Sequence, residues 1–246
     1  MTMQVGMVGD GGVLIASDTL VMDKPKREAA SEEQSPVRDT SNESKIIINY
    51  KKGIAISCAG TMRSARRVAR KIISGLMDEQ LANPREPIEK IGAEVLKLLG
   101  LDGEKRDVQC LIIIHGATPG LYFFEFGEVD GDCGPVLGPI CTKVIKHKNA
   151  GDQGNPAVFW KLRYYERKPI RELIPLAAHL VVSASKLNSG SIDGLEIVLC
   201  DEDGIHRLNE QSTRKLEAQA KKWDTHIGSL FSNYKIKLGF DPKEAA

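Results

Sequence analysis

Short apolar segments bounded by turn residues dominate the first sixty positions of the chain. Segments 4–8 and 13–17 are separated by the turn sequence DGG, a spacing that predicts a β-hairpin. The segments KIIINY at 45–50 and GIAISCAG at 53–60 predict a second pair of strands. Strands joined by short turns pair antiparallel, so the chain is expected to open on antiparallel β-structure.

The hydrophobic period changes to that of helices directly after Gly60. Apolar residues fall on one face of a predicted helix over 62–76, and arginines occupy another face. We interpret the arginines as a solvated or subunit-facing surface. Pro84 and Pro87 interrupt the pattern, and a second amphipathic helix is predicted over 88–99.

Strands and paired helices alternate again in the second half of the chain. A hairpin is predicted over 108–126 and is followed by a glycine-rich loop. Helices are predicted at 156–166 and 170–186, then the strands LEIVLC and IHRL, then a C-terminal helix at about 210–230. The order of elements predicts an α+β fold in which helix layers cover antiparallel sheets.

Domain organisation and bulk composition narrow the possible partners. We expect one domain over 1–246, with a polar surface insertion loop at about 23–44, where apolar residues are almost absent. The 34 Lys and Arg balance 33 Asp and Glu, and aromatic residues make up 5% of the chain. Neither nucleic acid nor a membrane is therefore expected as a partner. No apolar run approaches the roughly 18 residues of a membrane span, and no secretion signal is evident.

The cysteines predict a reducing, cytoplasmic location. Their number is odd and they are dispersed, which favours free thiols over a disulfide framework. Cys133 and Cys141 with His147 could suggest a metal site, but no second tight pair accompanies them, so no metal is expected. The glycines lie in neither a dinucleotide-binding nor a phosphate-binding context, so no cofactor is expected.

Candidate chemistry begins at the second residue. Removal of Met1 would leave Thr2 with a hydroxyl and a free α-amine. A threonine hydroxyl is a weak nucleophile that needs a base beside it, and an α-amine with a pKa near ~8 is partly neutral at pH 7. Thr2 is therefore a candidate N-terminal nucleophile, although its position alone is also that of an ordinary second residue.

Four segments, taken in order, carry a resemblance that covers most of the chain. TMQVGMVGDGGVLIASD places Thr2 at its start and Asp18 at its end, and SKIIINY places Lys45 at the start of a strand. AISCAGTMRSAR is a strand–glycine–helix junction, and NSGSIDGLEIV is a Ser-Gly loop before a late strand. Together they resemble a proteasome β-type subunit of the N-terminal nucleophile (Ntn) hydrolases, a bacterial proteasome homologue.

This resemblance implies a four-layer αββα sandwich, with two antiparallel sheets between helix layers. It also implies that Thr2 attacks a peptide carbonyl, with its own amine or a bridging water as the base. Lys45 would lower the pKa of that amine and stabilise the alkoxide, and Asp18 would keep Lys45 protonated.

Three further residues receive roles from the same resemblance. The N–H of Gly60 would line the oxyanion hole. Ser189 would hydrogen-bond the Thr2 amine, or simply cap a loop. Cys58 would line the pocket for a bulky apolar substrate side chain.

The sequence departs from the family pattern at three places. The stretch between Asp18 and Lys45 is longer than the family usually has. Lys186 stands where the family carries an acid, three positions before the Ser-Gly pair. The family's Gly-Ser-Gly loop reads Gly-Asp-Gln-Gly at 151–154, with Asp152 as a candidate replacement for the serine.

The resemblance therefore predicts a threonine peptidase that assembles into a homo-oligomeric ring. Its substrate would be a peptide or an unfolded protein, and an unfoldase is a candidate partner. Two alternatives stay open: a catalytically silent scaffold subunit, favoured by the departures, and a transpeptidase or amidotransferase that uses Thr2.

Overall fold

The computed structural model of the chain describes residues 2–20, 44–99, 107–131, 134–152, 154–188 and 192–233. The strands of these residues are β1 (Met3–Gly9), β2 (Gly12–Ser17), β3 (Ile46–Asn49), β4 (Ile54–Gly60), β5 (Val108–Ile114), β6 (Gly120–Gly131), β7 (Gly134–Lys143), β8 (His147–Gly151), β9 (Glu196–Asp201) and β10 (Gly204–Arg207). The α-helices are α1 (Met62–Gly75), α2 (Arg85–Leu99), α3 (Ala157–Tyr164), α4 (Ile170–Leu187) and α5 (Glu210–Asn233).

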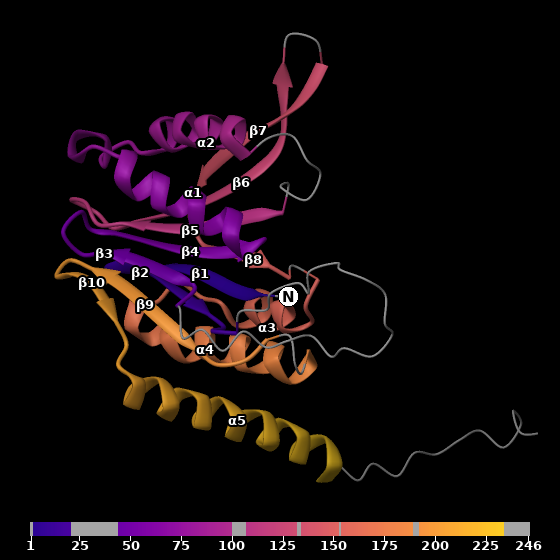
Figure 1. The fold of residues 1–246 in the computed structure, drawn as a ribbon. Coiled ribbons are helices and arrows are strands. Elements are labelled where there is room, and N and C mark those ends of the chain that lie inside the picture. The colour runs from indigo at the N-terminus through magenta and orange to yellow at the C-terminus, as the bar shows by residue number, and fades with distance from the viewer. Residues whose placement is uncertain are drawn as a thin grey trace, which may run out of the picture.

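Two five-stranded antiparallel sheets form the centre of the described structure. Their strand orders are β3-β4-β5-β6-β7 and β10-β9-β2-β1-β8. Helices α1 and α2 cover the outer face of the first sheet, and α3 and α4 cover the outer face of the second (Figure 1). Helix α5 lies outside α4 as an additional element (Figure 1). None of the helices in the described part of the chain is long and apolar enough to cross a membrane.

Alternation along the strands assigns each side chain to one layer. On β1, Val5 and Met7 pack against α4, and Gln4, which precedes Val5 and points to the opposite face of the strand, reaches toward the other sheet. On β4, Ile56 and Cys58 pack beneath α1, while Ala55 and Ala59 face the space between the sheets. The two sheets therefore share an apolar interface, and its edge lies where β1 begins and β4 ends.

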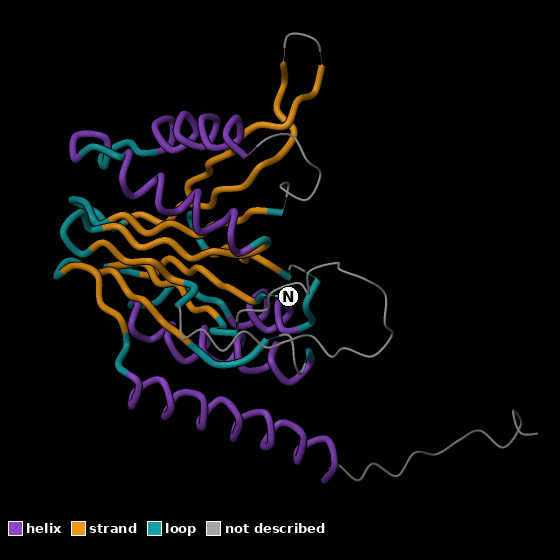
Figure 2. Tube along the Cα trace, in the orientation of Figure 1, coloured by secondary structure: helices purple, strands orange, loops and turns teal. Residues whose placement is uncertain are grey.

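Two sequence predictions differ from the observed elements. The second helix begins at Arg85 rather than at 88, because Pro87 falls in the first turn, where a missing N–H costs no intrahelical hydrogen bond. The predicted glycine-rich loop after 126 is instead largely strand: β6 continues to Gly131, and β7 and β8 follow (Figure 2). The prolines of β7 are tolerated because β7 is an edge strand of its sheet.

Two further predictions concern the C-terminal helix and the insertion loop. Helix α5 occupies 210–233, where a helix was predicted at about 210–230. The predicted insertion loop at about 23–44 lies outside the described residues, apart from its last residue, Ser44.

Candidate active site

The start of β1 and the end of β2 bring Thr2 beside Asp18. Gln4 pairs with Ser17 in the antiparallel register, so the residues before Gln4 lie next to the residue after Ser17. The Met3 N–H donates to Asp18 Oδ1 at 2.9 Å, and the Asp18 N–H donates to the Met3 carbonyl at 3.1 Å. Thr2 itself is half-buried at this edge of the sheet.

Lys45 reaches this point from the other sheet. Its Nζ donates to Thr2 Oγ1 at 3.1 Å and to Asp18 Oδ2 at 2.6 Å. The Lys45 and Asp18 side chains are 1% and 0% exposed, so their ion pair is shielded from water. The structure thus joins three of the residues named from the sequence, and Thr2 is the only residue of the three that is partly exposed to solvent.

Burial acts on both members of the ion pair. It raises the pKa of Asp18 above 3.8, and the Lys45 charge opposes that shift without cancelling it. Burial also lowers the pKa of Lys45 below 10.5, against the opposing effect of Asp18. For both groups, burial opposes the charged form and the partner's opposite charge favours it.

A buried polar chain connects the two sheets behind this pair. Ser57 Oγ donates to Gln4 Oε1 at 2.8 Å, and Gln4 Nε2 donates to the Cys58 carbonyl at 2.6 Å. The Cys58 N–H in turn donates to the Lys45 carbonyl at 3.1 Å. The backbone that carries Lys45 is thereby fixed to β4 and, through Gln4, to β1.

The backbone at 151–152 holds the other side of Thr2. The Asp152 N–H donates to the Thr2 carbonyl at 2.8 Å, and the Gly151 N–H donates to Gln109 Oε1 at 2.8 Å. Gly151 has φ +87°, and a Cβ there would overlap the Thr2 carbonyl oxygen. Glycine is required at this position for the chain to pass so close to Thr2.

Gly60 ends β4 directly before α1. It has φ +86°, and a Cβ would overlap the carbonyl oxygen of Asp107, so the junction needs glycine for steric reasons. Its predicted role in an oxyanion hole stays a prediction. Helix α1 begins two residues later, at Met62.

The remaining candidate residues, Cys58, Ser189 and Lys186, differ in their surroundings. Cys58 is fully buried and its thiol lies against that of Cys110, so a substrate side chain would reach it only if neighbouring groups moved. Its role as a pocket residue stays a prediction. Ser189 lies outside the described residues. Lys186 forms an ion pair with Asp224 of α5 at 2.8 Å.

Sequence reasoning missed three groups that shape this site: Gln4, Ser57 and Gln109. The usable signal was a glutamine inside the apolar strand segment at 4–8, where an uncharged polar residue needs a buried partner. Among the described residues, no group of three or more His, Cys, Asp or Glu is arranged to hold a metal ion.

Compared by sequence, the chain matches no protein-family model and no curated protein. Compared by structure, it is similar to Anbu (ancestral beta-subunit) from Yersinia bercovieri, with a TM-score of 0.63 and 15% sequence identity. The match covers 96% of this chain and 100% of the Anbu chain. At this identity the likeness shows a shared fold, and it confirms the predicted α+β, proteasome-like four-layer architecture.

Proposed function

We propose that this protein is a threonine peptidase of the Ntn-hydrolase type, with Thr2 as its N-terminal nucleophile after Met1 is removed. One observation carries the proposal: a buried lysine, neutralised by a buried aspartate, contacts the Thr2 hydroxyl at 3.1 Å. An ion pair this deeply buried costs desolvation energy, and its stability value to the fold is small. A catalytic use of the positive charge accounts for that cost.

The geometry supports a specific direction of proton movement. Lys45 Nζ donates to a lone pair of Thr2 Oγ1, which favours the alkoxide over the hydroxyl. The hydroxyl proton would pass to the Thr2 α-amine, directly or through a water. Oγ1 then forms an ester with the substrate carbonyl carbon, the C–N bond breaks, and the leaving amine takes the proton. Water would hydrolyse the ester and restore Thr2.

The supporting polar groups are also part of the proposal. The Gly60 N–H would face the oxyanion, and Ser189 would contact the Thr2 amine. Asp152, whose N–H already binds the Thr2 carbonyl, would take the place of the family's loop serine. Lys186, which stands where the family carries an acid, is compatible with these roles, because its ammonium group is paired with Asp224 of α5.

We further propose that the protein works in the cytoplasm as a homo-oligomeric ring, on peptides or on proteins supplied by an unfoldase. The described cysteines are free, as is usual in a reducing compartment. Helix α3 and the end of α4 carry exposed large apolar side chains, which suit contact with another subunit: Phe159, Leu162, Tyr164 and Leu187. Light scattering after size-exclusion chromatography would measure the assembly.

Cleavage of unfolded protein and of peptide libraries, followed by mass spectrometry, tests the activity. We expect products from the wild type and none from Thr2→Ala, while Thr2→Ser retains part of the rate because it keeps the hydroxyl and the amine. Added amine nucleophiles distinguish hydrolysis from acyl transfer, because a transferase would give amide products of higher mass. No cleavage by either protein would favour a silent scaffold subunit, and equal cleavage by both would show that Thr2 is not the nucleophile.

A further inference from the structure

The segment that leads into Lys45 is held by side chains from distant parts of the chain. The Ser44 hydroxyl lies 2.6 Å from both carboxylate oxygens of Glu196 and accepts the Ile46 N–H at 2.9 Å. Arg207 Nη2 lies 3.0 Å from Glu196 Oε1 and donates to the Ile46 carbonyl at 2.9 Å. Both sequence neighbours of Lys45 are therefore fixed by side-chain contacts.

Glu196 also occupies a particular register position in its sheet. It begins β9, and its backbone pairs with Ser17 of β2, the residue directly before Asp18. Its side chain meanwhile holds Ser44, the residue directly before Lys45. Asp18 and Lys45 are 27 residues apart in the sequence, and Glu196 links the two segments that present them.

The ion pair within this arrangement is buried on the Glu196 side, whereas the Arg207 side chain is 39% exposed. Glu196 is 9% exposed, and burial raises the pKa of its carboxyl, opposed by the Ser44 hydroxyl and the Arg207 charge. A buried carboxylate that loses its partners pays a desolvation penalty, so the three groups stay together. Arg66 of helix α1, which covers the sheet that contains β3, adds a further contact by donating to the Ser44 carbonyl at 3.2 Å.

We propose that Ser44, Glu196 and Arg207 form a clamp that positions Lys45 against Thr2 and Asp18. The clamp makes Glu196 and Arg207 positioning residues for the N-terminal threonine, and this role rests on the function proposed above. Lys45 begins β3, and four contacts on its two neighbours set where its side chain leaves the backbone. A small displacement there changes the distance from Nζ to the Thr2 hydroxyl.

Ser44→Ala is the sharpest test, because it removes one hydroxyl and leaves the apolar core intact. Two measurements are made on the full chain: the rate of Thr2 acylation by a threonine-directed electrophile against pH, and the titration of Lys45 by NMR. We expect acylation at pH 7 to fall about 10- to 100-fold, since misplacement of about 1 Å has effects of this size. We also expect the acylation pH profile and the Lys45 titration to shift. Ser44→Thr, which keeps the hydroxyl, should restore both.

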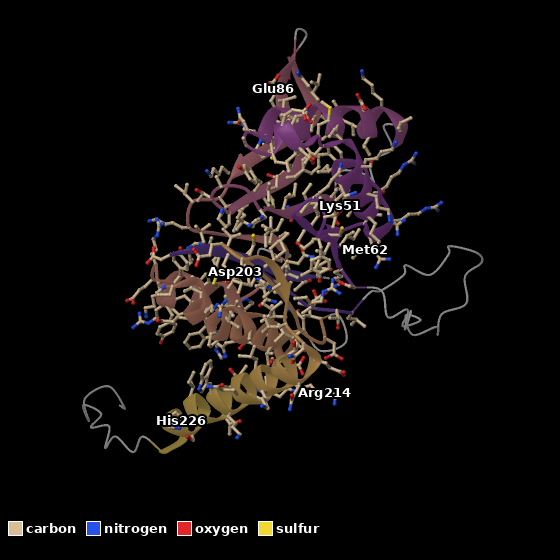
Figure 3. All side chains as sticks on the ribbon, turned by 90° about the vertical axis from the view of Figure 1, so that its left-hand side faces the viewer. Lys51, Met62, Glu86, Asp203, Arg214 and His226 are labelled. Carbon is tan, nitrogen blue, oxygen red and sulfur yellow. The ribbon has the colours of Figure 1, made fainter. Side chains whose placement is uncertain are left out.

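Glu86→Ala is the matched control, because Glu86 lies in an exposed ion pair on α2, away from α5 (Figure 3). It should leave both measurements at their wild-type values. A Ser44→Ala protein that only melts earlier, with an unchanged pH profile and an unchanged Lys45 titration, would overturn the clamp. An unreactive wild type whose Lys45 titration still shifts in Ser44→Ala would support the clamp and defeat the proposed function.

Discussion

Replacing Lys45 with Met tests the buried ion pair on which the candidate site is built. Lys45 Nζ lies 2.6 Å from Asp18 Oδ2. Two unit charges at that separation attract by roughly 6 kcal/mol at an effective dielectric of about 20. Taking each ion out of water costs several kcal/mol, so the intact pair contributes little net stability. Removing one partner is different, because it leaves the other charge buried and unpaired.

We expect Lys45→Met to lower the free energy of unfolding by about 3–5 kcal/mol at pH 7. Methionine fills the space of the lysine stem, so the loss comes from the uncompensated Asp18 charge. The pKa of Asp18, already raised by burial, rises further without Lys45. A carboxyl whose pKa is higher in the folded protein stabilises the fold at low pH and loses that contribution as the pH rises. The deficit of Lys45→Met should therefore shrink as the pH falls from 7 toward about 4.

Urea unfolding followed by circular dichroism at several pH values measures this deficit. Asp18→Asn should also destabilise, and the double variant should return to within about 1 kcal/mol of wild type because neither charge stays buried. Lys90→Met on the exposed face of α2 is the matched control and should have no measurable effect. A Lys45→Met deficit below about 1 kcal/mol, or a double variant as unstable as the single ones, would refute the reasoning.

Three further predictions concern other positions. Burial lowers the pKa of Lys161 from 10.5 to about 8. Between pH 8 and pH 10.5 the unfolded chain therefore binds a proton that the folded protein does not, and the free energy of unfolding should rise by up to about 1.4 kcal/mol per pH unit. The urea midpoint of Lys161→Met should not show this rise. Gly151→Ala should cost about 1–3 kcal/mol in thermal unfolding and slow Thr2 acylation, because φ at Gly151 is +87°. Gly154→Ala should do neither, because its Cβ would meet only Asp152 Oδ1, at an ordinary contact distance of 3.7 Å. Lys186→Ala should leave the rate of Thr2 acylation within about two-fold of wild type, because the Lys186 ammonium group is paired with Asp224 of α5. A tenfold loss of rate, about 1.4 kcal/mol, would place Lys186 at the site.

The sequence supported the fold well, because the elements are strongly periodic. The hairpin around DGG and the change of period at Gly60 gave strand and helix types that the structure retains. The strands between Gly127 and Gly151 were not predicted, because glycine and proline, judged from the sequence alone, indicate loops. Only the tertiary position of β7, at the edge of its sheet, makes its prolines compatible with a strand.

The sequence named three residues that the structure brings together, but it did not predict their distances. The resemblance named Thr2, Asp18 and Lys45, but nothing in their spacing measures how far the Lys45 ammonium lies from the Thr2 hydroxyl. The role of the clamp residue Glu196 could not be predicted from the sequence, because it depends on the register between β2 and β9. Its partner Ser44 lies at the end of a polar segment, where a serine has no distinguishing local signal.

The most direct test of the central claim is the intact mass of the protein after reaction with a threonine-directed electrophile. We predict that the purified chain lacks Met1 and gains one adduct, that tandem mass spectrometry locates the adduct on Thr2, and that Thr2→Ala gains none. A chain that retains Met1 and forms no Thr2-dependent adduct would contradict the account.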